Sequence, residues 1–156
     1  MADFAYRPMF DAHHNDTPWR KLEGDYVEVD TFRGEEVVVI KPGALAELTR
    51  EAFRDISFYL RPGHLAQLRA ILDDPEASGN DRFVALDMLK NANIASGGVL
   101  PMCQDTGTAI IMAKKGDKVW TTGSDEEELS TGVFRTYDQE NLRFSQLSPI
   151  SMFEEK

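Results

Sequence analysis

A length of 156 residues suits a single domain, and 42% apolar with 28% charged residues is typical of a globular protein rather than a disordered one. The net charge of −10, from 27 acidic and 17 basic residues, argues against nucleic acids and anionic membranes as partners, because both are bound through cationic surfaces. The longest uninterrupted apolar run, 109–113, is far shorter than the roughly 20 residues of a spanning helix, so we expect no membrane segment.

The cysteine content and the first residues indicate a reducing compartment. Cys103 is the single cysteine of the sequence, so the chain forms no internal disulfide. Residues 1–7 lack the basic start and the apolar stretch of a secretory signal peptide. Together these two features favour an intracellular, cytoplasmic protein.

Residues 1–24 are predicted to be an irregular N-terminal extension. The stretch carries two prolines, the pair His13-His14 and scattered aromatic residues. No internal repeat and no linker divides the remainder of the chain. Residues 25–156 are therefore expected to form one α+β unit, mainly helical with short β-hairpins.

The first regular element is predicted to be a β-hairpin. Tyr26–Val29 alternates weakly between apolar and polar residues, and Glu36–Ile40 is rich in β-branched residues. The pair Arg33-Gly34 between these two segments supplies the turn.

Two amphipathic helices are predicted to follow the hairpin. The first begins at Pro42, and the breaker Arg61-Pro62-Gly63 separates it from the second, which ends near Pro75. Their apolar stripes, spaced by three and four residues, are Leu45, Leu48, Ala52, Ile56 and Tyr59 in the first and Leu65, Leu68, Ile71 and Leu72 in the second.

A third helix is predicted between Asn80, as its N-cap, and Gly97-Gly98. Its apolar residues are spread around its circumference rather than gathered in one stripe. We therefore expect this helix to be buried on most sides.

The rest of the chain is predicted to hold a second hairpin and a last helix. The apolar run that ends at Ala113 and the segment Lys118–Thr121 are expected to pair across a turn. Ser124 with Glu127 three residues later is a capping-box signature, and the helix that it begins carries an apolar face through Leu129, Val133 and Tyr137. A loop-like tail is expected from residue 142 onward.

The segment Pro101–Gly107 is the candidate functional site. Cys103, Gln104, Asp105 and Thr106 are consecutive there, on a stretch shaped by proline and glycine. A thiolate is a soft ligand suited to iron–sulfur clusters, and a carboxylate beside an amide can orient a substrate or a proton. The competing interpretation is that Cys103 is a small buried apolar residue.

Other kinds of site have less support in the sequence. A cysteine nucleophile needs a histidine base, and nothing in the spacing ties His13, His14 or His64 to the cysteine. No Cys/His ligand spacing indicates a zinc site either. Arg143 follows the last helix in a short loop, where it can present its guanidinium to a carboxylate or lie exposed without a role.

Four stretches resemble the N-terminal region of the iron–sulfur class I fumarate hydratases. They are GGVLPMCQDTGTA at 97–109, AFRDISFYLRP at 52–62, DDPEASGND at 73–81 and YDQENLR at 137–143. The likeness runs from about residue 25 to the end of the sequence. The related tartrate dehydratases share a similar version of the cysteine-containing stretch.

The resemblance implies a hydro-lyase that interconverts fumarate and (S)-malate with a [4Fe-4S] cluster held by three cysteines. Cys103 matches the first of these ligands. Gln104 and Asp105 match residues that contact the dicarboxylate, and Asp105 is placed to assist proton transfer. Arg143 matches an arginine that grips a substrate carboxylate. The complete enzyme is expected to be a homodimer.

Family members are much longer, and the other two cluster cysteines and the proposed base lie in parts absent from this sequence. We therefore expect the chain to be the N-terminal part of such an enzyme and to be inactive alone. Two alternatives stay open. One is a tartrate or other hydroxydicarboxylate dehydratase, and the other is a non-catalytic assembly domain that binds neither iron nor a dicarboxylate.

Overall fold

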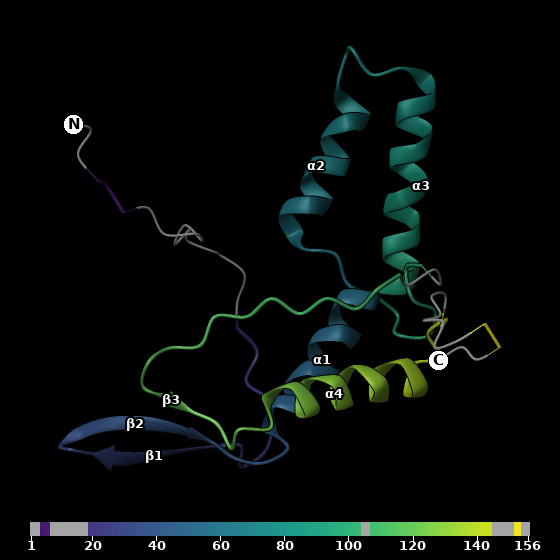
Figure 1. The fold of residues 1–156 in the computed structure, drawn as a ribbon. Coiled ribbons are helices and arrows are strands. Elements are labelled where there is room, and N and C mark those ends of the chain that lie inside the picture. The colour runs from purple at the N-terminus through teal and green to yellow at the C-terminus, as the bar shows by residue number, and fades with distance from the viewer. Residues whose placement is uncertain (1–3, 7–18, 104–106, 145–151, 154–156) are drawn as a thin grey trace.

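The computed structural model describes residues 4–6, 19–103, 107–144 and 152–153, and within them the chain is mainly helical with a small sheet (Figure 1). The elements in chain order are β1 (Val27–Phe32), β2 (Glu35–Ile40), α1 (Ala44–Phe58), α2 (Pro62–Asp73), α3 (Gly79–Ala95), β3 (Val119–Trp120) and α4 (Asp125–Gln139). The α+β prediction is confirmed. None of the helices in these described ranges is long and apolar enough to cross a bilayer.

The predicted first hairpin is present as β1 and β2. The two strands pair antiparallel from Val27 opposite Ile40 to Phe32 opposite Glu35. Arg33 and Gly34 connect them with φ angles of 53° and 84°. Two successive positive φ angles are typical of a type I′ turn, whose twist matches that of the paired strands.

The predicted second hairpin is wrong. Val119–Trp120 pairs in parallel with β2, with Val38 opposite Val119, and the run 109–113 belongs to no strand. The N–H of Val38 donates to the carbonyl of Lys118 at 2.8 Å, so β3 extends the edge of the existing sheet. The Trp120 ring also meets the Phe32 ring of β1 edge-on at 5.0 Å, which adds a side-chain contact between β3 and the first hairpin.

Helices α1 and α4 form the most closely packed pair. Gly132 of α4 lies directly against α1, since a Cβ built on it would come within 2.6 Å of the Thr49 Cβ. Thr136, one turn further along α4, is 0% exposed, and its hydroxyl lies 3.1 Å from the carbonyl of Arg50. The small residue and the hydroxyl together let two backbones approach where larger apolar side chains would hold them apart.

Helices α2 and α3 form a second pair that projects away from α1 and α4 (Figure 1). The prediction that α3 is buried on most sides is wrong, because Phe83 is 62% and Ile94 63% exposed. Its buried residues are the alanines Ala85, Ala92 and Ala95. A helix with apolar residues all round can turn only one face toward α2, so the remaining apolar residues face outward.

The helix ends correct three further details of the sequence prediction. Helix α3 is capped by Ser78, not Asn80, because the Ser78 hydroxyl accepts the N–H of Asp81 at 3.1 Å and the Asp81 carboxylate accepts the N–H of Ser78 at 2.9 Å. Helix α1 begins at Ala44 rather than Pro42. The side chain of Ser124 makes no cap hydrogen bond, although α4 does begin directly after it.

Candidate functional site

The candidate site is built on the loop that leaves the C-terminal end of α3. The N–H of Gly97 donates to the carbonyl of Ile94 at 3.1 Å, and that of Gly98 to the carbonyl of Ala95 at 2.9 Å. Gly98 has a φ of 72°, a left-handed conformation that glycine adopts at little cost. This turn ends the helix and directs the chain toward Cys103, whose side chain is exposed rather than buried.

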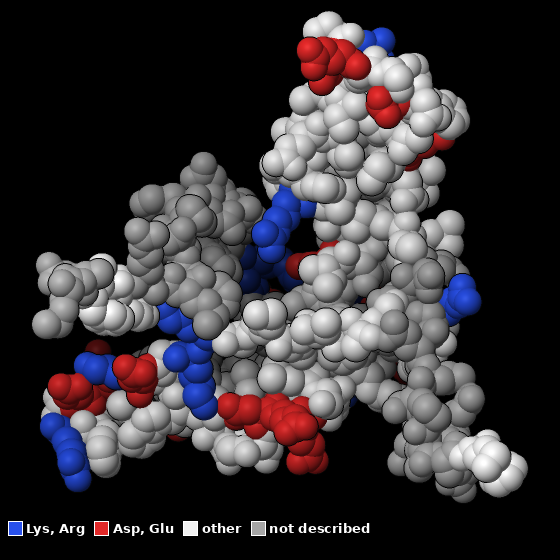
Figure 2. Space-filling view, turned by 45° about the horizontal axis from the view of Figure 1, so that its top comes forward, with Lys and Arg blue, Asp and Glu red and all other residues white. Residues whose placement is uncertain are grey.

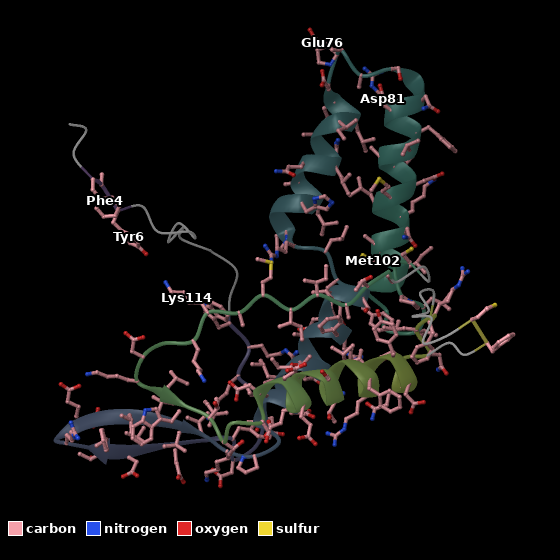
Figure 3. All side chains as sticks on the ribbon, viewed as in Figure 1. Phe4, Tyr6, Glu76, Asp81, Met102 and Lys114 are labelled. Carbon is pink, nitrogen blue, oxygen red and sulfur yellow. The ribbon has the colours of Figure 1, made fainter. Side chains whose placement is uncertain are left out.

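Met102, the residue before Cys103, is held by two helices at once. Its N–H donates to the carbonyl of Ser57 in the last turn of α1 at 2.9 Å. Its carbonyl accepts the side-chain amide of Asn91 on α3 at 2.7 Å. The last four carbonyls of a helix have no partner within it, so Ser57 is a natural acceptor for an incoming loop. Figure 3 shows Met102 beside the C-terminal end of α3.

Cys103 borders a cavity of about 350 Å³ between α1, α4 and the loop. The other residues that line it are Phe53, Ile56, Ser57, Met102, Thr108, Ala109, Ile110, Tyr137 and Leu142. The cavity is therefore largely apolar with a few hydroxyl groups and one thiol. A size and lining of this kind suit a small-molecule ligand.

The end of α4 supplies the opposite wall of this cavity and leads into Arg143. Asn141 adopts a φ of 51°, and the N–H of Leu142 returns to the carbonyl of Tyr137 at 3.0 Å. This is the Schellman arrangement of a helix C-terminus, with asparagine in the left-handed position. Leu142 is only 4% exposed and Tyr137 is buried beside it. Arg143 comes next and is exposed.

An ion pair joins α1 to the end of α4 beneath the site. The Arg54 Nε donates to the Glu140 carboxylate at 3.0 Å, and both side chains are partly buried. The Arg54 guanidinium also lies 5.6 Å from the centre of the Phe58 ring, which is almost fully buried. These contacts fix the α4 terminus, and with it Arg143, relative to the helix that holds the Cys103 loop.

A charge cluster on α1 shares no residue with the cavity lining. Hydrogen bonds from Arg50 lower the pKa of the Glu47 carboxyl, and the same bonds raise the pKa of the Arg50 guanidinium. Arg20 bonds Glu51 at 3.0 Å and Asp55 at 2.9 Å, which attaches the segment before the sheet to this helix. The cluster is an ion-pair network of the fold rather than part of the site.

The structure describes only part of the predicted residue set. Cys103 and Arg143 lie on the two segments that the cavity brings together, whereas Gln104 and Asp105 fall outside the described residues. His64 lies in the first turn of α2, away from the cavity lining, and His13 and His14 also fall outside the described residues. No histidine is therefore among the described residues that line the cavity with Cys103.

The donor set fits a metal cluster only in part. A thiolate exposed at the edge of a cavity is a suitable iron–sulfur ligand. Yet Cys103 is the single cysteine of the sequence, and among the described residues no three His, Cys, Asp or Glu side chains gather into a metal site. The chain can thus supply one ligand, and a cluster held by three cysteines needs two from elsewhere.

Sequence reasoning missed the residues that hold the loop. Asn91 and Ser57 carry no motif of their own, and their roles depend on how α1 and α3 meet the loop. Tyr137 belongs to the apolar face of α4 that the sequence predicts, whereas the position of Leu142 in the cavity wall depends on the turn at Asn141. An asparagine directly after a helical pattern is a signal for such a turn.

A family model and several known proteins that are similar to this chain agree on one family. The family model described as "Fumarate hydratase (Fumerase)" matches residues 46–156. The anaerobic class I fumarate hydratase of Escherichia coli K12 is 52% identical over 152 residues, 97% of this chain and 28% of that protein. Its aerobic class I counterpart is 51% identical over the same share. "Fumarate hydratase 1, mitochondrial" of Leishmania major is 48% identical over 100% of this chain and 29% of its own length.

The chain thus spans little more than a quarter of the length of these relatives. The matched region of the family model begins within α1 and includes α2, α3, the Cys103 loop and α4. Because this model covers most of the chain and the relatives are about half identical to it, the chain belongs to the fumarate hydratase family.

Proposed function

We propose that this chain is the N-terminal, cluster-ligand-bearing part of an enzyme that hydrates fumarate reversibly to (S)-malate, with residues 1–24 as an extension and 25–156 as the functional region. The observation that carries the proposal is the position of Cys103. It is the single thiol of a fumarate hydratase family chain and borders a ligand-sized cavity on a loop tied to two helices. Relatives named fumarate hydratase support the choice of reaction.

Within that enzyme, Cys103 would hold one iron of a [4Fe-4S] cluster as its thiolate. The cluster supplies Lewis-acid chemistry toward a hydroxyl and a carboxylate when bound. The residues of this chain then have three tasks. Gln104 and Asp105 contact the dicarboxylate, Asp105 assists proton transfer, and Arg143 offers a planar guanidinium to a substrate carboxylate.

The remaining ligands and the catalytic base are assigned to the part of the enzyme that this chain does not contain. Relatives more than three times as long support this division. We propose that the complete enzyme is a homodimer and acts on small dicarboxylates. We also propose a cytoplasmic location, in keeping with the single cysteine, while one relative carries "mitochondrial" in its name.

The test compares Cys103→Ser in the isolated chain and in the complete enzyme. In the complete enzyme we expect loss of bound iron and sulfide and loss of fumarate turnover, because a hydroxyl is a poor replacement for a soft thiolate. In the isolated chain we expect no turnover after anaerobic reconstitution and an unchanged melting temperature, because the side chain is exposed.

Two results would contradict the proposal. Robust fumarate turnover by the isolated chain would show that it does not depend on further cluster ligands. A full cluster in the Cys103→Ser enzyme would show that Cys103 is not a ligand. Iron and sulfide should therefore be counted in the same samples in which turnover is measured.

A further inference from the structure

Asn91 makes the side-chain contact that α3 offers to the main chain next to Cys103. It lies in the second-last turn of the helix, and its Nδ2 is 2.7 Å from the carbonyl oxygen of Met102. The N–H of Met102 donates to the carbonyl of Ser57 at 2.9 Å. Both main-chain polar groups of Met102 are thereby bonded, one to each helix.

Only one of these two hydrogen bonds depends on the type of side chain. The Ser57 acceptor is a backbone carbonyl at the end of α1 and would be supplied by any residue at that position. The Asn91 donor is a side-chain amide, short enough to hold its nitrogen close to the helix and able to donate without carrying a charge. A leucine or alanine at residue 91 would leave the Met102 carbonyl without this bond.

Asn91 is not required to pack α3 against α2. The buried residues of α3 are Ala85, Ala92 and Ala95, whereas Asn91 is exposed. Its hydrogen bond spans 11 residues and reaches from the helix to the loop. The contact therefore acts on the loop rather than on the helix pair.

We infer that Asn91 is a positioning residue for Cys103. Its amide fixes the carbonyl of Met102, and the next α-carbon in the chain carries the thiol. The geometry of the loop rests on the described contacts alone, while the consequence for a metal cluster rests on the proposed function. The positioned thiolate would meet the iron with little further ordering of the loop.

The first experiment measures hydrogen exchange of the Met102 amide in this 156-residue chain, by NMR. The variants are Asn91→Ala and Asn91→Asp, the second having nearly the same shape but no N–H to donate. The Met102 N–H exchanges when the loop opens and its bond to Ser57 breaks, and opening becomes easier without the Asn91 bond to the same residue. A hydrogen bond of about 1 kcal/mol corresponds to roughly fivefold in this opening equilibrium, so we expect Met102 exchange to accelerate about three- to tenfold in both variants.

Asn93 provides the matched control. It lies on the same helix two residues later and is likewise exposed, and its side chain bonds no described residue of the Cys103 loop. Asn93→Ala and Asn93→Asp should leave the Met102 exchange rate unchanged. Equal acceleration by the Asn91 and Asn93 variants, or normal exchange in Asn91→Asp, would overturn the inference.

A second experiment measures the mobility of the Cys103 side chain. Because Cys103 is the single cysteine, a nitroxide label reacts at one position without any further substitution. We expect a narrower, more mobile spectrum for labelled Asn91→Asp than for labelled Asn93→Asp, with equal melting temperatures for the two. Identical spectra would mean that Asn91 does not restrain the residue that bears the thiol.

The consequence for the cluster is measured in the complete enzyme. Asn91→Asp should lower the iron content after reconstitution and alter the electron paramagnetic resonance signal of the oxidised cluster, while Asn93→Asp should do neither. A normal cluster in Asn91→Asp would overturn the positioning role. If Cys103→Ser also retained its cluster, the proposed function would fail separately, since the exchange measurement does not depend on iron.

Discussion

The carboxylate of Glu128 in the first turn of α4 caps the beginning of α1, where it accepts the N–H of Gly43 at 3.0 Å. Its second oxygen accepts the N–H of Leu45 at 3.1 Å. Gly43 has no side chain with which to cap α1 itself, and the first N–H groups of a helix have no partner within it. A side chain 85 residues away in the sequence thus does the work of a local cap.

Replacing Glu128 should therefore loosen the contact between α1 and α4. We expect Glu128→Ala to reduce the free energy of unfolding by about 1–2 kcal/mol, because it removes two hydrogen bonds to a carboxylate and a favourable charge at a helix N-terminus. Denaturant unfolding followed by circular dichroism measures this difference. Glu127→Ala is the control, since Glu127 is exposed in the same turn, and an equal loss in both variants would contradict the capping role.

A second prediction concerns the close approach at Gly132. A Cβ there would lie 2.6 Å from the Thr49 Cβ and closer still to the carbonyl oxygen of Ala46. We expect Gly132→Ala to destabilise the fold by about 1–3 kcal/mol, despite alanine's higher helix propensity, because backbone atoms cannot move aside cheaply. Gly63 in α2 has no atom within 4 Å of such a Cβ, so Gly63→Ala should be neutral or stabilising in the same unfolding experiment.

These two contacts also explain how far the sequence could predict the fold. The helices and the first hairpin follow from local signals, namely apolar spacing, Pro62 at the start of α2 and the Arg33-Gly34 turn. The cap by Glu128 and the tight contact at Gly132 join α1 to α4 and leave no local signature. The same holds for β3, which pairs with a strand about 80 residues earlier instead of with its neighbour.

The candidate site shows the same division. Cys103 and Arg143 could be proposed from the sequence because their residue types and their resemblance to a family mark them. The cavity could not be predicted, since it needs α1, the Cys103 loop and the end of α4 in one place.

The prediction that α3 is buried on most sides was wrong, because the number of apolar residues in a helix does not indicate which other elements pack against that helix. In Figure 2 the part of the surface that α2 and α3 form is largely uncharged below the charged residues at its tip.

A third prediction concerns the capping box at α3. The hydroxyl of Ser78 donates a hydrogen bond that lowers the pKa of the Asp81 carboxyl, and the backbone N–H of Ser78 adds a smaller effect in the same direction. A carboxyl whose pKa is lowered by folding stabilises the protein above its unfolded value of about 3.9, and this contribution is lost as the pH falls through the lower folded value. Asp81→Asn should therefore be less stable than the parent at neutral pH.

The difference between Asp81→Asn and the parent should shrink as the pH falls through the lowered pKa of Asp81, because both proteins then carry an uncharged side chain at residue 81. Urea unfolding midpoints at neutral pH and at the acidic end measure this convergence. Asp117→Asn makes the same charge change in an exposed turn and should match the parent at both values. A constant difference for Asp81→Asn across the range would contradict the titration argument.

A fourth prediction concerns the turn at Asn141. Its φ of 51° is left-handed, which glycine adopts freely and a β-branched residue resists. Asn141→Gly should leave stability nearly unchanged, and Asn141→Val should lower it by about 1–2 kcal/mol. Thermal unfolding of the two variants side by side tests the pair, and equal melting temperatures would mean that the left-handed turn is not required.

The fifth prediction concerns the division of labour between Arg143 and Asp105 in the complete enzyme, on the proposed function. Arg143→Lys keeps the charge but loses the planar fork that matches a carboxylate, so we expect mainly a higher KM for fumarate. Asp105→Asn keeps the shape but removes the ionisable group, so we expect mainly a lower kcat. Both are measured by steady-state kinetics with the cluster content of each sample counted. Normal turnover by Asp105→Asn with a full cluster would make Asp105 a structural residue of the loop. An unchanged KM in Arg143→Lys would move the carboxylate contact to another part of the enzyme.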